Sequence, residues 1–237
     1  MKKNIFLITG TSSGIGYEIT RKLLNNSQCF VIGIGRTETK IKSRNFKFIQ
    51  FDLQSDNFYD LFNKINKITN YIDCFINNAG ISSSGNKTAD LEKTFKTNVF
   101  AGYKISKYFC KKNINKKRKL NLIHIGSISG KIALPNNISY NSSKAALLMM
   151  SKSFALDYAK YNVRSNSIVL GYFPTNMTKS TFRNKKSRNE KIKRTMLGRL
   201  GKLEEIFETI KFLSSNKSSY ITAQEITIDG GWTSKGL

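Results

Sequence analysis

Cysteine, proline and histidine are scarce in this chain of 237 residues, which contains 3, 2 and 1 of them. Cys29, Cys74 and Cys110 are widely spaced, odd in number and without a C-x-x-C pair. This pattern argues against a disulfide framework and against a zinc site. We therefore expect a protein of a reducing compartment, the cytoplasm, with no metal ion.

Long apolar runs are also missing. The run near the N-terminus extends only from Ile5 to Ile8, whereas a membrane-spanning helix needs about 20 apolar residues and a signal peptide also needs a longer apolar core. No repeat, linker or low-complexity stretch divides the chain. We expect no membrane segment and one domain over residues 1–237, with enough apolar side chains (39%) to form a core.

Acidic residues are few, with 15 Asp and Glu against 40 Lys and Arg, which gives a formal charge of +25. Such a balance suits a partner that is a polyanion. It also arises when a whole sequence is biased toward lysine, and lysine is abundant throughout this chain. No basic helix with interleaved aromatic residues is evident, so we expect no nucleic-acid partner.

Short apolar runs rich in β-branched residues alternate with segments of helical periodicity. This alternation predicts a doubly wound parallel α/β sheet of the Rossmann type, with helices on both faces. The expected strands are Asn4–Thr9, Phe30–Gly35, Phe46–Phe51, Ile72–Asn77, Leu120–Gly126, Val163–Leu170 and Glu225–Asp229. The expected helices are Tyr17–Asn25, Phe58–Ile68, Leu91–Lys111, Ser139–Tyr161 and Leu203–Leu213.

The first strand leads directly into a glycine-rich turn and then a helix. Gly10 permits the tight turn, Gly14 lets the backbone approach a pyrophosphate, and Gly16 allows close helix packing. The start of the following helix attracts the anion. The turn predicts a dinucleotide site, whose further members are Ser12, Ser13 and Ile15.

The second strand ends at Gly35 and Arg36. A site for NAD would be expected to offer a carboxylate there to the ribose 2′-hydroxyl. Arg36, with Thr37 beside it, is suited instead to a 2′-phosphate, because a guanidinium forms bidentate bonds to phosphate oxygens. We expect NADP(H) to be preferred over NAD(H).

Tyr140 and Lys144 are four residues apart at the start of an expected helix, so their side chains share one face. A free tyrosine titrates near pH ~10, and a nearby ammonium with an oxidised nicotinamide would favour its phenolate. Ser127 follows the fifth strand and would reach the same edge of the sheet. The three side chains predict acid–base chemistry beside a nicotinamide. His124, in an apolar strand, is interpreted as structural.

With these motifs the sequence resembles the short-chain dehydrogenase/reductase family over nearly its whole length. Its length and ending are similar to those of the 3-oxoacyl-[acyl-carrier-protein] reductases and their relatives. The matching residues, beyond those named above, are Asp52, Asn77-Asn78-Ala79-Gly80, Asn98, Gly171, Thr175, Arg199, Gly201 and Asp229-Gly230-Gly231.

The resemblance implies a role for each matching position. Tyr140 would exchange the proton, Lys144 would tune it and hold the ribose, and Ser127 would orient the substrate oxygen. Asn98 would support a proton relay through water. The remaining cofactor contacts would be Asp52 and Leu53 near the adenine, Asn78, Ala79 and Gly80 along the cleft, and Gly171 and Thr175 near the carboxamide. A homotetramer or homodimer would form through the helices Leu91–Lys111 and Ser139–Tyr161.

Two positions depart from the family pattern: Leu170-Gly171 replaces Pro-Gly, and Thr222-Ala223 replaces Thr-Gly. The first leaves the turn before Thr175 less fixed. Residues 172–198 lack strand character and follow the sixth strand, where a cover over the crevice is expected, so we interpret them as a substrate lid.

The sequence does not determine the identity of the substrate. The lid carries eight basic residues and only Glu190 as an acid. That density would suit an acidic carrier protein, a coenzyme A thioester or a nucleotide-linked sugar, while a small neutral ketone remains an alternative. A further alternative of another class is a protein that binds a dinucleotide or nucleic acid without catalysis.

Overall fold

The computed structural model describes residues 3–82 and 87–235, with only the backbone described at residues 180 and 181. Its centre is a seven-stranded sheet in which all neighbouring strands are parallel. The strand order is β3-β2-β1-β4-β5-β6-β7. The strands are β1 Asn4–Thr9, β2 Cys29–Gly35, β3 Phe46–Gln50, β4 Cys74–Asn77, β5 Leu120–Ser127, β6 Val163–Leu170 and β7 Glu225–Ile228.

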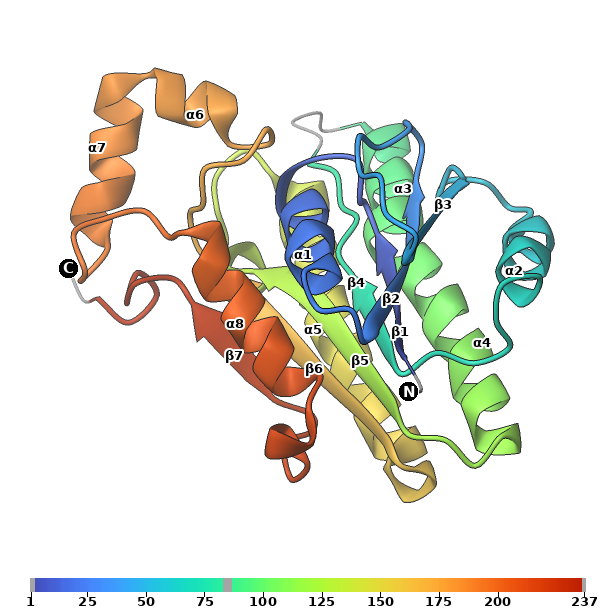
Figure 1. Ribbon diagram of the computed structural model, residues 1–237. Helices are drawn as coiled ribbons and strands as arrows, with labels where there is room; N and C mark the ends of the chain where they lie inside the picture. Colours follow the sequence, from blue (N-terminus) through green and yellow to red (C-terminus); the bar gives the residue numbers. More distant parts are fainter. Residues whose placement is uncertain (1–2, 83–86, 236–237) are drawn as a thin grey trace.

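Helices cover both faces of this sheet (Figure 1). The central strands are apolar because both of their faces are buried, as in Leu7 and Ile8 of β1, which are fully inaccessible. One core layer lies against α2, α4 and α5, and the other lies against α1 and α8. The helices are α1 Gly14–Leu24, α2 Phe58–Asn66, α3 Thr88–Phe95, α4 Ala101–Asn115, α5 Ile138–Tyr158, α6 Lys179–Arg183, α7 Lys185–Arg194 and α8 Leu203–Leu213. The predicted doubly wound parallel fold is confirmed.

The strand order reverses at β1, which pairs with β2 on one side and with β4 on the other. Chain connections leave the two strands in opposite directions, so a crevice opens at their carboxyl ends. The loops that follow β1, β4 and β5 all meet at this crevice. The topology therefore fixes the place of the site before any side chain is considered.

The helix expected over Leu91–Lys111 is instead α3 and α4 joined by a π-helical turn, Lys96–Phe100. A π turn adds one residue to a helical turn, which periodicity does not reveal, and such turns are frequent at functional sites. Asn98 lies within it.

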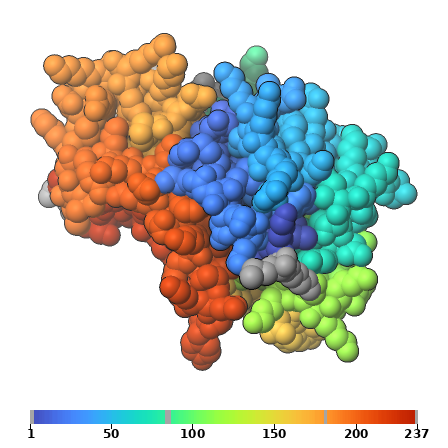
Figure 2. Space-filling view, in the orientation of Figure 1, coloured from blue at the N-terminus to red at the C-terminus, as the bar shows by residue number. Residues whose placement is uncertain are grey.

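The segment 172–198 contains the two short helices α6 and α7. Figure 2 shows this part of the chain as a lobe at the upper left, standing off from the body of the molecule. Over residues 3–82 and 87–235, the helices are too short or too polar to cross a membrane.

Candidate active site

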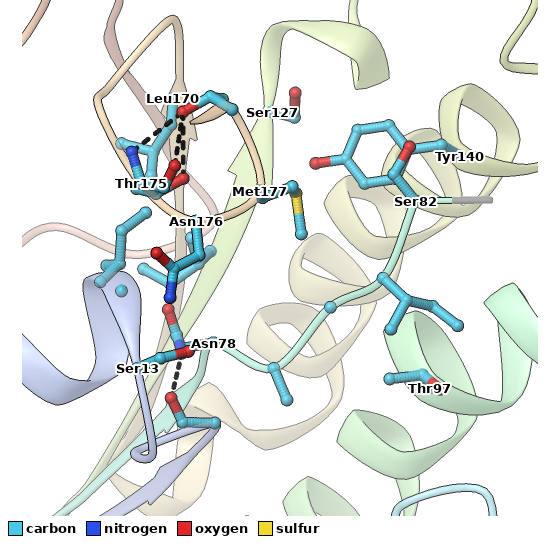
Figure 3. Close-up of a pocket in the computed structure, with 18 of the residues that line it drawn as sticks. Ser13, Asn78, Ser82, Thr97, Ser127, Tyr140, Leu170, Thr175, Asn176 and Met177 are labelled. Carbon is cyan, nitrogen blue, oxygen red and sulfur yellow. Dashed lines mark hydrogen bonds between the residues drawn. The ribbon is translucent and has the colours of Figure 1, made fainter. Parts of the chain in front are cut away.

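A cavity of about 550 Å³ opens at the carboxyl edge of the sheet (Figure 3). Its walls come from the loops after β1 to β6, which are far apart in the sequence. Nearly all the residues predicted to contact a cofactor line it, namely Gly10, Ser12, Ser13, Gly14, Ile15, Arg36, Thr37, Asp52, Leu53, Asn78, Ala79, Gly80, Tyr140, Lys144, Gly171 and Thr175. Gly16 and Asn98 lie behind its wall, and each supports residues that line it.

The glycine turn has the backbone that its sequence demands. Gly10 and Gly14 have φ values of 76° and 58°, in the left-handed region that favours glycine. A Cβ atom at Gly16 would lie 2.2 Å from the carbonyl oxygen of Gly10, so only glycine allows α1 to pack this close to the turn. Ser13, at the N-cap of α1, makes no side-chain capping bond. The turn thus forms a cradle at a helix N-terminus, a geometry that suits a pyrophosphate.

Asn78 joins the loop after β4 to the end of β1. Its Nδ2 donates to the carbonyl oxygen of Thr9 at 2.8 Å, and its backbone N–H donates to Thr9 Oγ1 at 3.0 Å. The backbone N–H of Ala79 donates to the same hydroxyl at 3.0 Å. These bonds hold the two sides of the crevice at a fixed separation.

Arg36 and Thr37 lie at the far end of the cavity, where Ser12 Oγ donates to the carbonyl oxygen of Thr37. Gln50 Nε2 donates to the carbonyl oxygen of Arg36 at 2.9 Å. The Arg36 side chain is exposed and forms no ion pair with the acidic residues that the structure describes. Its guanidinium is therefore available to an anionic group in this end of the cavity.

The other end of the cavity contains Tyr140, Ser127 and Lys144. The Tyr140 hydroxyl points to the space between Ser127 and Met177 (Figure 3). Lys144 is 4% exposed, and its ammonium lies 5.6 Å from the centroid of the Tyr140 ring and donates to the carbonyl oxygen of Ile125 at 2.7 Å. The sequence-predicted trio is thus brought together.

Burial shifts both titratable groups of this trio. It raises the pKa of Tyr140, while a hydrogen bond with Ser127 acts in the opposite direction. It lowers the pKa of Lys144 to about 8. The protein's own residues therefore keep the phenol protonated at neutral pH, as a proton donor requires. The phenolate preference expected from the sequence requires positive charge beyond that of Lys144.

Asn98 holds the loop after β4 from behind. Its Oδ1 accepts from the backbone N–H of Ile81 at 2.8 Å, and its Nδ2 donates to the carbonyl oxygen of Ile81 at 3.0 Å. The same Nδ2 donates to Ser143 Oγ at 3.0 Å, and Ser143 Oγ donates to the carbonyl oxygen of Tyr140 at 2.9 Å. The π-helical turn thereby links the cavity wall to the first turn of α5.

The turn before Thr175 is well fixed despite Leu170 in place of proline. Thr178 Oγ1 accepts from the backbone N–H of Thr175 at 2.9 Å and donates to the carbonyl oxygen of Phe173 at 2.6 Å. A Cβ atom at Gly171 would lie 2.8 Å from the Cα atom of Asp229, which explains the glycine. The looser turn that we expected from the missing proline is not seen.

Several residues of the cavity wall were missed at the level of sequence. They include Ser82, Leu134, Asn137, Asn176, Met177 and Thr178. The N-cap position of Asn137, three residues before Tyr140, was the one available signal. The others lie on irregular loops, whose paths depend on packing.

Comparison with known proteins agrees with this geometry. The family model described as Enoyl-(Acyl carrier protein) reductase matches residues 10–233. The chain is 33% identical to the 3-oxoacyl-[acyl-carrier-protein] reductase FabG of Buchnera aphidicola subsp. Schizaphis graminum, covering 98% of both chains. It is 34% identical to the reductase of that name from Rickettsia prowazekii, covering 95% of both.

Among solved structures, 4-hydroxyisoleucine dehydrogenase complexed with NADH superposes with a TM-score of 0.95 at 28% identity, covering 99% of this chain and 100% of that one. The family match begins at Gly10 and spans the rest of the glycine turn, the Ser127, Tyr140 and Lys144 trio, and strands β2 to β7. The chain therefore belongs to the short-chain dehydrogenase/reductase family of oxidoreductases.

Proposed function

We propose that this protein is an NADP(H)-dependent oxidoreductase that interconverts a carbonyl and a secondary alcohol. The observation that carries the proposal is the convergence of Ser127, Tyr140 and Lys144 at one end of a cavity whose other end is a glycine-rich anion cradle. A cofactor that carries hydride supplies the redox chemistry. The cradle suits such a group, because Gly14 carries no side chain where it lines the cavity, and Gly10 and Gly16 let the turn and α1 pack closely.

Each member of the trio has a separate task. Ser127 Oγ orients the substrate oxygen, and the Tyr140 hydroxyl gives that oxygen a proton in the reducing direction. The Lys144 ammonium favours the resulting phenolate electrostatically and holds the cofactor ribose. Asn98 keeps Ile81 and the first turn of α5 in place, so that a water relay can return a proton to Tyr140.

Preference for NADP(H) rests on Arg36. The Arg36 guanidinium follows β2, is exposed and has no ion-pair partner among the described acidic residues, so it can bind a 2′-phosphate through charge-assisted hydrogen bonds. Asp52 lines the same end and would contact the adenine, with Leu53 beside it. The neighbour 4-hydroxyisoleucine dehydrogenase was solved with NADH, so both cofactors belong in the first assays.

The test of the reaction is Tyr140→Phe. We expect this variant still to bind NADPH and to lose at least about 100-fold in turnover, because it lacks the proton donor. Cofactor fluorescence titration and NADPH oxidation with 3-oxoacyl thioesters, nucleotide-linked keto sugars and simple ketones give the two readouts. Retention of full turnover by this variant would contradict the mechanism.

The natural substrate is proposed to be an acyl group on an acidic carrier protein or on coenzyme A. The curated relatives are reductases of acyl-carrier-protein substrates by name. The segment 172–198, proposed as the substrate lid, is strongly basic, as such a carrier requires. A nucleotide-linked sugar remains the second candidate, because the same basic lid suits its phosphates.

A further inference from the structure

The wall of the cavity near Tyr140 has a polar side and an apolar side. Ser82 and Asn137 form the polar side, on the loop after β4 and at the start of α5. Leu134, Tyr172 and Met177 form the apolar side. A substrate carbonyl held at the Tyr140 hydroxyl therefore has different chemical neighbours in two directions.

Asn137 occupies the N-cap of α5 without capping it, since its side chain makes no bond to the first turn. Asparagine at this position ordinarily accepts a hydrogen bond from that turn. Here its Nδ2 donates to Ser82 Oγ at 3.1 Å, and its Oδ1 lies 3.3 Å from the same hydroxyl. The amide is thus turned away from its own helix and toward the rim of the cavity.

The spacing between Asn137 and Tyr140 limits what the amide can reach. Asn137 is the residue just before α5 and Tyr140 is in its first turn, and both line the cavity. An oxygen held by the Asn137 amide therefore belongs to a group only a few bonds from the carbonyl at Tyr140. One hydroxyl contacts both polar ends of the amide, so hydrogen-bonding capacity remains for a ligand.

The apolar side is built as a fixed surface. Asn141 Nδ2 donates to the carbonyl oxygen of Leu134 at 2.8 Å and ties that loop to α5. Leu134 and Tyr172 pack against a cluster that contains Ile128 and Trp232. This side offers contact to a hydrocarbon chain.

We propose that Asn137, positioned by Ser82, is a specificity-determining residue that binds a second oxygen of the substrate. The substrate class is then a ketone with a carbonyl or carboxylate oxygen two carbons from the reacting carbon and an apolar group on the other side. A 3-oxoacyl group has this pattern. The inference rests on the proposed carbonyl reduction and adds the residue that selects among carbonyl compounds.

The test compares two substrates and three variants. Wild-type protein, Asn137→Ser, Asn137→Gln and Ser82→Ala are assayed for NADPH oxidation with a 3-oxoacyl thioester and with a simple ketone of equal chain length. Serine is as good an N-cap as asparagine, so Asn137→Ser keeps α5 intact while it removes the amide. Asn137→Gln keeps the amide on a longer side chain, and melting temperatures report on folding.

We expect Asn137→Ser to lose about 10- to 100-fold in kcat/KM on the thioester and less than about threefold on the simple ketone. Asn137→Gln should recover part of the loss, and Ser82→Ala should show a smaller loss of the same selectivity. Equal losses on both substrates, or no loss on either, would overturn the inference. Failure of wild-type protein to reduce any carbonyl compound would instead contradict the proposed function itself.

Discussion

His124 is fully buried on β5, three residues before Ser127. Asn77 Nδ2 lies 3.2 Å from its Nδ1, and the Phe154 ring stacks against it with centroids 6.4 Å apart. Burial, with a smaller contribution from the Lys144 charge, lowers the pKa of His124 to about 3. The side chain is therefore neutral in the folded protein over the whole range in which an unfolded histidine titrates.

This difference makes folding stability depend on pH. Below pH ~6.5 the unfolded chain binds a proton at His124 that the folded protein rejects, so the free energy of unfolding falls as the pH falls toward 3. From pH 6.5 to 4.5 the contribution is on the order of 2 kcal/mol. Urea unfolding of wild-type protein and His124→Gln at several pH values should show a shallower decline in the variant. Parallel curves would contradict this prediction.

At the residue scale, the chemistry could be predicted where it depends on local spacing. Tyr140 and Lys144 share a face because they are one helical turn apart, and Gly10 and Gly14 need positive φ wherever they occur in such a turn. The N-cap position of Asn137 was a signal of its place but not of its role, and Thr178 had no such signal, because the roles of both depend on which loop lies opposite them.

At the scale of elements, the strands were predicted closely because buried parallel strands are short, apolar and bounded by polar residues. The start of α1 and the presence of the π-helical turn were not predicted. The start of α1 at Gly14 depends on the close approach of Gly16 to Gly10. The π-helical turn depends on the contacts of Asn98 with Ile81 and Ser143. Such tertiary contacts leave no periodic signal in the sequence.

At the scale of elements, the prediction concerns the basic residues of α7. None of its side chains is buried, and its last residue, Arg194, lies 5.3 Å from the Trp232 ring. Lys185, Lys186 and Arg188 form no ion pair with the described acidic residues. If the lid attracts an anionic carrier, changing these three to Glu should raise KM for that substrate about tenfold at low salt, with a smaller effect at high salt.

Lys116, Lys117 and Lys119 provide the matched control. They lie in the turn before β5, at the opposite edge of the sheet from the cavity, and are exposed. Changing them to Glu alters the net charge equally without touching the lid. Equal effects of the two triple variants on KM would show that the +25 charge acts as a general field and not through the lid.

At the scale of the whole molecule, α5 has an exposed apolar stripe. Ile138, Met149 and Leu156 are 67%, 61% and 84% exposed, and Phe100 at the end of the π-helical turn and Tyr103 in α4 are also exposed. A stripe of this length on a helix that is otherwise packed against the sheet marks an association surface. We propose that a second copy of the chain covers it, in a homodimer or homotetramer.

We expect Leu156→Arg to shift the protein toward the monomer in light scattering coupled to gel filtration, because it adds a charge to an apolar contact that both copies make. Tyr59→Arg, on the exposed face of α2, is the control with the same charge change at a side chain that is 76% exposed. An unchanged mass for both variants would place the contact elsewhere.

The cavity draws its walls from loops that follow six different strands, and the last of them ends at Leu170. A chain that is still being synthesised, or whose C-terminal strands have not yet joined the sheet, lacks part of the dinucleotide site. The protein therefore gains affinity for the coenzyme in one step, when the last strands join the sheet. A dinucleotide present during refolding therefore binds only the folded protein. We expect it to lower the unfolding rate more than it raises the folding rate.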